Sequence, residues 1–145
     1  MENRVTKTYV LDTSVVVKWF VSEEDSDKAK IFLKDYEEGK IDIVVPSNLY
    51  YEATNVFWLK KQEGFTEEEA LDSIEDLMRL DLEAVLSTEL LKEGLKLAHR
   101  YEIAVYDSIF LALASERDLE LVTADRRLYD KVKGDFSGVK LLKLI

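Results

Sequence analysis

The 145-residue chain contains no cysteine, one histidine, one proline and five glycines. Without cysteine it can form no disulfide, thiol nucleophile or thiolate zinc site. A single histidine excludes a histidine-rich metal centre and any acid–base mechanism that uses two histidines. No stretch approaches the roughly 20 apolar residues that span a bilayer. Any catalysis is therefore expected to rely on oxygen groups.

The chain also lacks an excess of basic charge, since 20 Lys and Arg face 30 Asp and Glu for a net charge of −10. Nucleic-acid binding is normally driven by basic residues that neutralise phosphates, so this balance argues against passive binding. The argument weakens if several acids bind a divalent cation, because the cation reverses the local field. The basic residues expected near such acids are Lys18, Lys60, Lys61, Arg126 and Arg127.

The length is that of one ordinary domain, and we predict a single domain over residues 1–145. The opening MENRVTKTYV is polar before its first apolar run, unlike a signal peptide. We therefore expect a cytoplasmic protein with no membrane association.

Short β-rich runs alternate with helical patterns along the chain. The predicted strands are residues 7–11, 41–45, 82–86, 120–124 and 139–144. Such alternation is typical of an α/β fold, with a parallel sheet of about five strands flanked by helices on both faces. Ligands of these sheets bind at the carboxyl ends of the strands.

The helices are predicted from caps and apolar spacing. One begins near residues 22–26 and stops at Gly39, with Ala29, Ile31, Phe32 and Tyr36 as its apolar face. The others are expected from Pro46 or Ser47 to about Lys61, from a Thr66–Glu69 capping box to Arg79, from Ser87 or Thr88 with Leu91, Leu95 and Ala98 facing inward, from Tyr106 onward, and from Arg126 to about Lys133.

Four acidic residues stand at comparable places in this pattern. Asp12 ends the first β-run in LDTS, and Asp125 ends a later one in TAD. Asp107 opens a helix in YDS, and Glu52 lies within the helix after the second strand. All four are expected at one edge of the sheet. Converging carboxylates repel one another and so imply a divalent cation.

A simpler role is open to the three aspartates, because each stands where a helix is expected to begin. Aspartate is a favoured helix N-cap, worth about 1 kcal/mol. Glu52 differs, because it is expected inside a helix, and its simple alternative is a solvated face. It forms a polar stripe with Asn48 and Asn55 beside an apolar face, which favours a position facing a cleft.

Short hydroxyl residues accompany the aspartates and can hold metal-bound waters or cap helices: Thr13, Ser14, Ser108 and Thr123. Oxygen ligands without nitrogen or sulfur suit Mg²⁺ or Mn²⁺ rather than zinc. Both ions bind phosphate oxygens, so a phosphate ester is the expected substrate. We take Asp12 and Asp107 as direct ligands, with Asp125 and Glu52 contacting the ion or its waters.

The order of Asp12 in LDTS, Glu52 in a helix, Asp107 in YDS and Asp125 in TAD resembles that of the PIN-domain nucleases. The resemblance spans about residues 9–142, and the chain is similar in size to VapC-type toxins. It implies a PIN-like fold with a five-stranded parallel sheet. It also implies an endoribonuclease that depends on Mg²⁺ or Mn²⁺ and is inhibited by a small cognate antitoxin protein.

Position by position, the resemblance implies a catalytic metal site of Asp12, Glu52, Asp107 and Asp125. The residues expected to support it are Thr13, Ser14, Asn55, Ser108 and Thr123. Lys18, Arg126 and Arg127 are expected to guide the RNA backbone. No direct DNA binding by this chain alone is expected.

Other functions stay open on the sequence. An RNA-processing PIN nuclease outside a toxin–antitoxin system would carry the same acids. A PIN-like binding module would usually have lost one or more of them, whereas all four positions are acidic here. A strand ending in Asp12-Thr13 also suits an aspartyl-phosphate phosphatase, but its second aspartate, two residues on, is replaced by Ser14. The absence of GxGxxG and GxxxxGK[ST] disfavours dinucleotide and P-loop sites.

Aromatic residues gather in two segments beyond the evident need of one small core. The set is Trp19, Phe20, Tyr50, Tyr51, Phe57 and Trp58. About half are expected in the core. The rest are expected at a homodimer interface or in a groove for an antitoxin helix, because aromatic residues are enriched at such surfaces.

Overall fold

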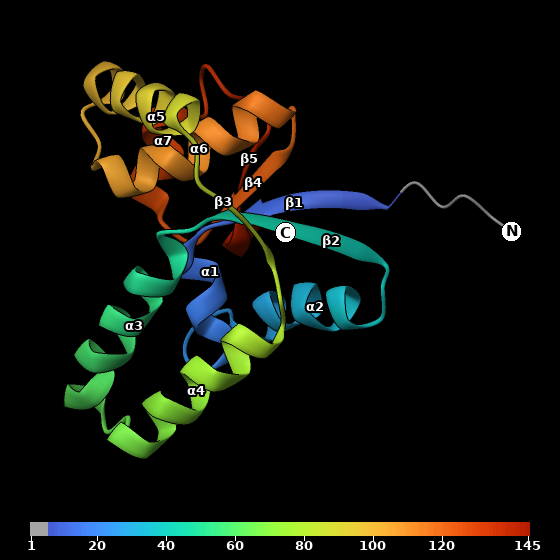
Figure 1. Ribbon diagram of the computed structural model, residues 1–145, viewed down its shortest axis with the longest axis vertical. Helices are drawn as coiled ribbons and strands as arrows, with labels where there is room; N and C mark the ends of the chain where they lie inside the picture. Colours follow the sequence, from blue (N-terminus) through green and yellow to red (C-terminus); the bar gives the residue numbers. More distant parts are fainter. Residues whose placement is uncertain (1–5) are drawn as a thin grey trace, which may run out of the picture.

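The computed structural model describes residues 6–145, which form a wholly parallel five-stranded sheet with helices on both faces (Figure 1). The strands are β1 (Lys7–Leu11), β2 (Ile41–Pro46), β3 (Glu83–Val85), β4 (Glu120–Thr123) and β5 (Val139–Leu141). The predicted fold class is confirmed. Residues 1–5, which contributed to the signal-peptide argument, lie outside the described part of the chain.

The strand order β3-β2-β1-β4-β5 reverses direction at β1. From β1 the chain adds β2 and β3 on one side, then crosses to β4 and β5 on the other. Val10 of β1 is therefore in register with Val44 of β2 and Leu121 of β4. Connections leave β1 and β4 toward opposite faces, which opens a crevice at their carboxyl ends. This crevice is the expected ligand site of the fold.

The helices divide between the two faces of the sheet. Figure 1 shows α1–α4 on one side and α5–α7 on the other. In chain order the helices are α1 (Thr13–Val16), η1 (Val17–Trp19), α2 (Ser26–Glu37), α3 (Leu49–Leu59), η2 (Lys60–Glu63), α4 (Glu67–Arg79), α5 (Thr88–Tyr101), α6 (Val105–Arg117), α7 (Arg126–Val132) and η3 (Leu142–Leu144). None of the helices in the described residues is long and apolar enough to cross a membrane.

The core follows from continuous apolar runs in the central strands and in α6. Val10, Leu11, Val44 and Val45 are fully buried, as expected for strands covered on both faces. Helix α6 packs on β1, β2 and β4 and is apolar over 109–114. It thus carries its amino end, with Asp107, to the crevice.

Several predicted details were wrong. Pro46 is the last residue of β2 rather than part of a helix, and α3 begins later, at Leu49. In α2 the side chain of Ile31 is 59% exposed, while Leu33 packs against the core. Residues 142–144, expected to continue the last strand, form the 3-10 turn η3.

Of the three apolar residues predicted to face inward from α5, only Ala98 is buried. Leu91 and Leu95 are 46% and 51% exposed, whereas Leu90 and Leu97 are buried. Gly94 explains the choice, because α5 lies so close to α6 that a Cβ there would be 2.7 Å from Cγ1 of Ile109. Because α5 carries apolar residues on two stripes, the sequence does not determine which stripe is buried. The close contact with α6 determines it.

The structure also decides which residue caps α5. The hydroxyl of Ser87 accepts a hydrogen bond from the Leu90 N–H at 3.1 Å, while Thr88 is the first, exposed helical residue. Ser87→Ala is expected to lower the free energy of unfolding by about 1 kcal/mol. Thr88→Ala, the matched control, should change it by less than about 0.5 kcal/mol. Urea denaturation measures both, and equal losses would contradict this assignment.

Candidate functional site

Asp12 lies at the crevice between β1 and β4. Its N–H donates to the Val122 carbonyl of β4 at 3.2 Å, and the residue is only 4% exposed. It stands at the N-cap position of α1, yet its side chain makes no capping hydrogen bond. The carboxylate instead accepts a hydrogen bond from the Ser14 hydroxyl. The Val15 N–H lies near enough to lower the pKa of this carboxylate, but it makes no hydrogen bond of capping geometry with it.

Two hydroxyl groups join the strand ends that carry Asp12 and Asp125. Besides donating to Asp12, Ser14 Oγ accepts from the Ala124 N–H at 2.9 Å. Thr123 Oγ1 accepts from the Asp125 N–H at 3.0 Å and lies 3.5 Å from Ser14 Oγ. This network fixes the β1–α1 corner against the β4–α7 corner, so the two predicted supporting residues hold the acids in place.

Asp125 is a helix cap as well as a member of the site. Its Oδ1 accepts from the N–H groups of Arg127 and Leu128 at 2.9 and 3.3 Å, at the start of α7. Asp107 is not a cap, because Ala104 occupies that position of α6 and Asp107 follows within the first turn. Of the three aspartates, only Asp125 therefore has the capping role that all three could have had.

Glu52 lies in the first turn of α3 and not mid-helix as predicted, because the helix begins at Leu49. The side-chain amide of Asn48 donates to Glu52 Oε2. Among the described residues, the buried hydroxyl of Thr13 has no hydrogen-bond partner of good geometry. It lies near the Glu52 carboxylate, however, and lowers the pKa of that group. Asn55, expected on the same stripe, is exposed.

Ser108 does not face the crevice. Its hydroxyl is fully buried and lies 2.6 Å from the carbonyl oxygen of Gly94, to which it donates, and 3.0 Å from that of Val105. The side chain therefore serves the contact between α5 and α6. Its predicted role beside metal-bound waters does not agree with this position.

The acids are linked by burial and mutual repulsion. Burial raises the pKa of Asp12 to about 6, opposed by the hydrogen bond from Ser14 and reinforced by repulsion from Asp107. The pKa of Glu52 is raised to about 7, chiefly by burial and also by the charges of Asp107 and Asp12, against the hydrogen bond from Asn48. The pKa of Asp107 is raised by burial and by the charge of Asp125. All four acids thus belong to one electrostatic cluster.

The cluster does not form a finished coordination shell. Within residues 6–145, no three acidic or histidine side chains are gathered closely enough to hold an ion. The donor set still fits a hard cation, because it consists only of oxygens that are desolvated and repel one another. Mg²⁺ and Mn²⁺ suit this arrangement, since such ions keep several waters and reach further carboxylates through them.

Few of the predicted basic residues face the acids. Lys18 donates to Glu23 at 3.1 Å and to the Glu24 carbonyl at 2.8 Å. Lys60 pairs with Glu23 and Glu63, both at 2.9 Å. These lysines are thus engaged by acids outside the cluster.

Arg127 does lie beside the cluster. It lines a cleft of about 230 Å³ together with Asp107, Asp125 and Lys131. Arg126 lies instead close enough to Lys143 to influence its pKa. Lys131 was missed from the sequence, although its position four residues after Arg127 on a helix could have indicated it.

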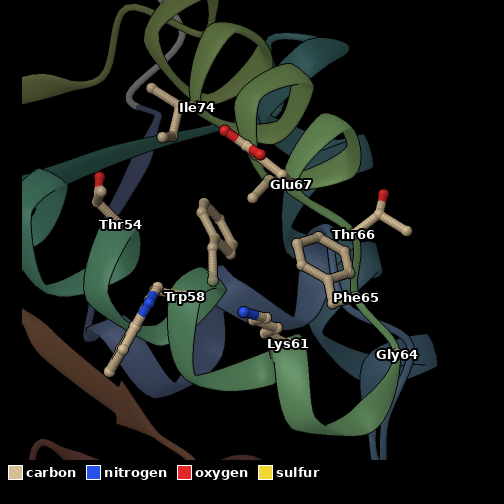
Figure 2. A pocket seen from close by; sticks show the side chains of 10 residues that line it. Thr54, Trp58, Lys61, Gly64, Phe65, Thr66, Glu67 and Ile74 are labelled. Atoms are coloured by element: carbon tan, nitrogen blue, oxygen red, sulfur yellow. The ribbon is translucent and has the colours of Figure 1, made fainter.

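A larger cavity lies elsewhere, between α3 and α4, and contains none of the four acids. Its volume is about 630 Å³. Thr54 and Trp58 of α3 lie across it from Ile74 of α4, with Phe65 at one end (Figure 2). Its lining is mainly apolar apart from Lys61, Glu67 and two threonines, so the acid cluster and not this cavity is the candidate for metal-dependent chemistry.

The predicted aromatic set divides as expected. Trp19 and Phe57 are buried, whereas Tyr51 and Trp58 are 85% and 68% exposed. Phe20 and Tyr50 are partly buried against the core. Tyr51 and Trp58 are therefore surface residues of α3 that the core does not need.

The raised pKa of Asp12 predicts how stability depends on pH without metal. The folded value of about 6 exceeds the ordinary 3.8, so the folded state binds more protons between these values. Stability therefore falls as pH rises through this window, by about 3 kcal/mol at most. In EDTA, Asp12→Asn should exceed wild type in unfolding free energy by about 2 kcal/mol at pH 8 and differ little at pH 4.

Urea denaturation at the two pH values measures this difference. Asp42→Asn, on an exposed position of β2, is the matched control and should follow wild type at both. A loss of stability in Asp12→Asn at pH 8 would contradict the repulsive cluster and favour a structural role for the carboxylate.

Known proteins agree with this fold. The chain matches the PIN-domain family model over residues 9–134. Ribonuclease VapC3 from Pyrobaculum aerophilum is 30% identical over 126 residues, covering 84% of this chain and 92% of that protein. A toxin–antitoxin complex from Klebsiella pneumoniae has a TM-score of 0.64 at 18% identity, covering 92% of this chain and 97% of that one.

The Mycobacterium tuberculosis toxin VapC20, described as cleaving the sarcin–ricin loop, has a TM-score of 0.61 at 14% identity, covering 88% of this chain and 95% of that one. At such identities the two solved structures support the fold alone. The family model and VapC3 each cover most of the chain, so they show the family as well as the fold. On their evidence the chain belongs to the PIN-domain family and has a VapC protein among its relatives.

Proposed function

We propose that this protein is a divalent-metal-dependent endoribonuclease, the toxin of a toxin–antitoxin pair. The observation that carries the proposal is the burial of Asp12 and the partial burial of Glu52 and Asp107, whose pKa values are raised by burial and by the charges of the other acids. Such mutual repulsion weakens the fold unless a cation is bound. The ribonuclease name of the 30% identical relative supports RNA as the substrate, and the proposed place of action is the cytoplasm.

Asp12 and Asp107 are the proposed direct ligands of Mg²⁺ or Mn²⁺. Asp125 keeps one oxygen available, because only its Oδ1 caps α7. It and Glu52 would contact the ion through waters, as the spacing of the acids suggests. The bound ion would supply an acidified water and offset charge that develops on the phosphate.

Glu52 is the proposed general base. Its pKa of about 7 lies near neutrality, where a side chain accepts and returns a proton most effectively. Asn48 holds Oε2, which leaves Oε1 to take the proton of the attacking water. The buried hydroxyl of Thr13 adjoins the same carboxylate and would stabilise its charged form.

The proposed protein partners are a cognate antitoxin and a second copy of the chain. The cavity between α3 and α4, with Trp58 and Phe65 at its edges, is the candidate groove for an apolar antitoxin segment. An antitoxin arginine that entered the crevice would inhibit by pairing with the acids. Tyr51, exposed on α3 near Glu52, is a candidate for the homodimer surface.

An RNA-processing nuclease outside a toxin–antitoxin system would use the same four acids and is the alternative. A short antitoxin gene next to this one is what the toxin assignment requires. The retention of all four acids argues against a binding module without catalysis.

Substitution of the direct ligands tests the assignment of the site. Asp12→Asn and Asp107→Asn should each lower metal-dependent RNA cleavage by about a hundredfold or more, because metal affinity and phosphate neutralisation are both lost. Cleavage of a labelled single-stranded RNA is measured with Mg²⁺ and with Mn²⁺. Asp130→Asn, which removes an exposed acid of α7, is the control. Full activity in the first two variants would show that the cleavage has another source.

Thermal melting tests metal binding without any assay of activity. Added Mg²⁺ should raise the melting temperature of wild type by a few degrees, as ligand binding to the folded state requires. The same addition should hardly move Asp107→Asn. If neither Mg²⁺ nor Mn²⁺ changes the melting temperature of wild type, the interpretation that the acids have only a structural role would be favoured.

A further inference from the structure

A narrow cleft leads away from the acidic cluster on the α5–α7 side of the sheet. Its volume is about 230 Å³, with Asp107 and Asp125 at the cluster and Arg127 and Lys131 along α7. The turn between α5 and α6 forms the opposite wall and contributes Glu102. The cleft thus joins two proposed metal-binding acids to two cations.

The walls of this cleft are held together by hydrogen bonds between distant segments. Lys131 Nζ donates to the Glu102 carbonyl at 2.9 Å, and the Tyr101 hydroxyl donates to the Asp135 carboxylate at 2.6 Å. Asp125 holds the Arg127 N–H at 2.9 Å. The cleft is therefore a built feature and not a gap between loose segments.

Arg127 and Lys131 differ from the other basic residues near the crevice. Lys18 and Lys60 form ion pairs with Glu23. Within residues 6–145, the guanidinium of Arg127 makes no hydrogen bond or ion pair, and Lys131 donates only to a neutral carbonyl. Both retain charge for an incoming anion, although Glu102 lines the same cleft. In a chain of net charge −10, such a pair beside the acids is conspicuous.

We propose that this cleft binds a phosphodiester of the substrate RNA next to the one that is cleaved, with Arg127 and Lys131 as its ligands. The proposal rests on the proposed nuclease function. Arginine binds phosphate oxygens in pairs, and Lys131, whose Nζ is held by the Glu102 carbonyl, adds a second positive charge. A cavity of about 230 Å³ is smaller than the usual small-molecule site of roughly 300–1,000 Å³, so it admits one phosphate and its sugar.

Steady-state cleavage of a single-stranded RNA tests the role of the cleft. Arg127→Ala should raise KM about tenfold with kcat little changed, because it removes a contact made equally by substrate and transition state. Lys131→Ala should act in the same direction and more weakly. Lys133→Ala is the matched control, since Lys133 directly follows the same helix but pairs with Asp130 outside the cleft. Equal effects of Arg127→Ala and Lys133→Ala would overturn the subsite.

Binding without cleavage supplies a second readout. A uridine trinucleotide is titrated into the ¹⁵N-labelled protein in EDTA, and the Arg127 side-chain N–H and the 126–128 amides are followed by NMR. They should shift in wild type, and the amides should shift less in Arg127→Ala. An equal response to inorganic phosphate would indicate a simple anion site, and unshifted signals in millimolar excess would overturn the proposal.

The two proposals fail in different ways. If wild type binds the trinucleotide in the cleft but cleaves no RNA with either metal, the nuclease function fails and the subsite stands. If wild type cleaves RNA while Arg127→Ala and Lys133→Ala behave alike, the subsite fails and the nuclease function stands.

Discussion

Carboxylates held out of water beside one another are the constraint around which this protein is built. Asp12 is almost fully buried, and the charge of another acid, Asp107, helps to raise its pKa. Burial and repulsion both favour the protonated form, which is why the pKa of Asp12 reaches about 6 and that of Glu52 about 7. The fold tolerates this repulsion between carboxylates because the buried strands of the sheet, and α6 packed against them, hold the backbone of the acidic residues in place.

Hydrogen bonds from neutral groups hold the cluster in position. Ser14 links Asp12 to the backbone after β4, and Asn48 holds one oxygen of Glu52. Neutral donors orient a carboxylate without cancelling its charge, whereas a lysine or arginine in their place would form an ion pair and compete with a metal. Asp125 is likewise held by neutral donors, because its Oδ1 accepts hydrogen bonds from backbone N–H groups where it caps α7.

Charged groups and apolar groups line two different regions of the surface. Acidic and basic side chains meet in the cleft of Arg127 and Lys131, which is the proposed site for a charged strand. Apolar contact is concentrated between α3 and α4, away from the acids. A protein partner could thus occupy α3 and α4 while a chain segment of that partner reached the crevice.

The sequence by itself determined the α/β class, the parallel sheet and the edge at which the four acids lie. These follow from local features, since β-rich runs, helical spacing and the Thr66–Glu69 capping box are each written in neighbouring residues. Only the tertiary structure decided that Asp125 caps a helix while Asp12 and Asp107 do not, and that Ser108 turns toward Gly94. It also decided that Arg127, and not Lys18, borders the acids. Each of these depends on contacts between segments far apart in the chain, such as the approach of α5 to α6, which local pattern does not encode.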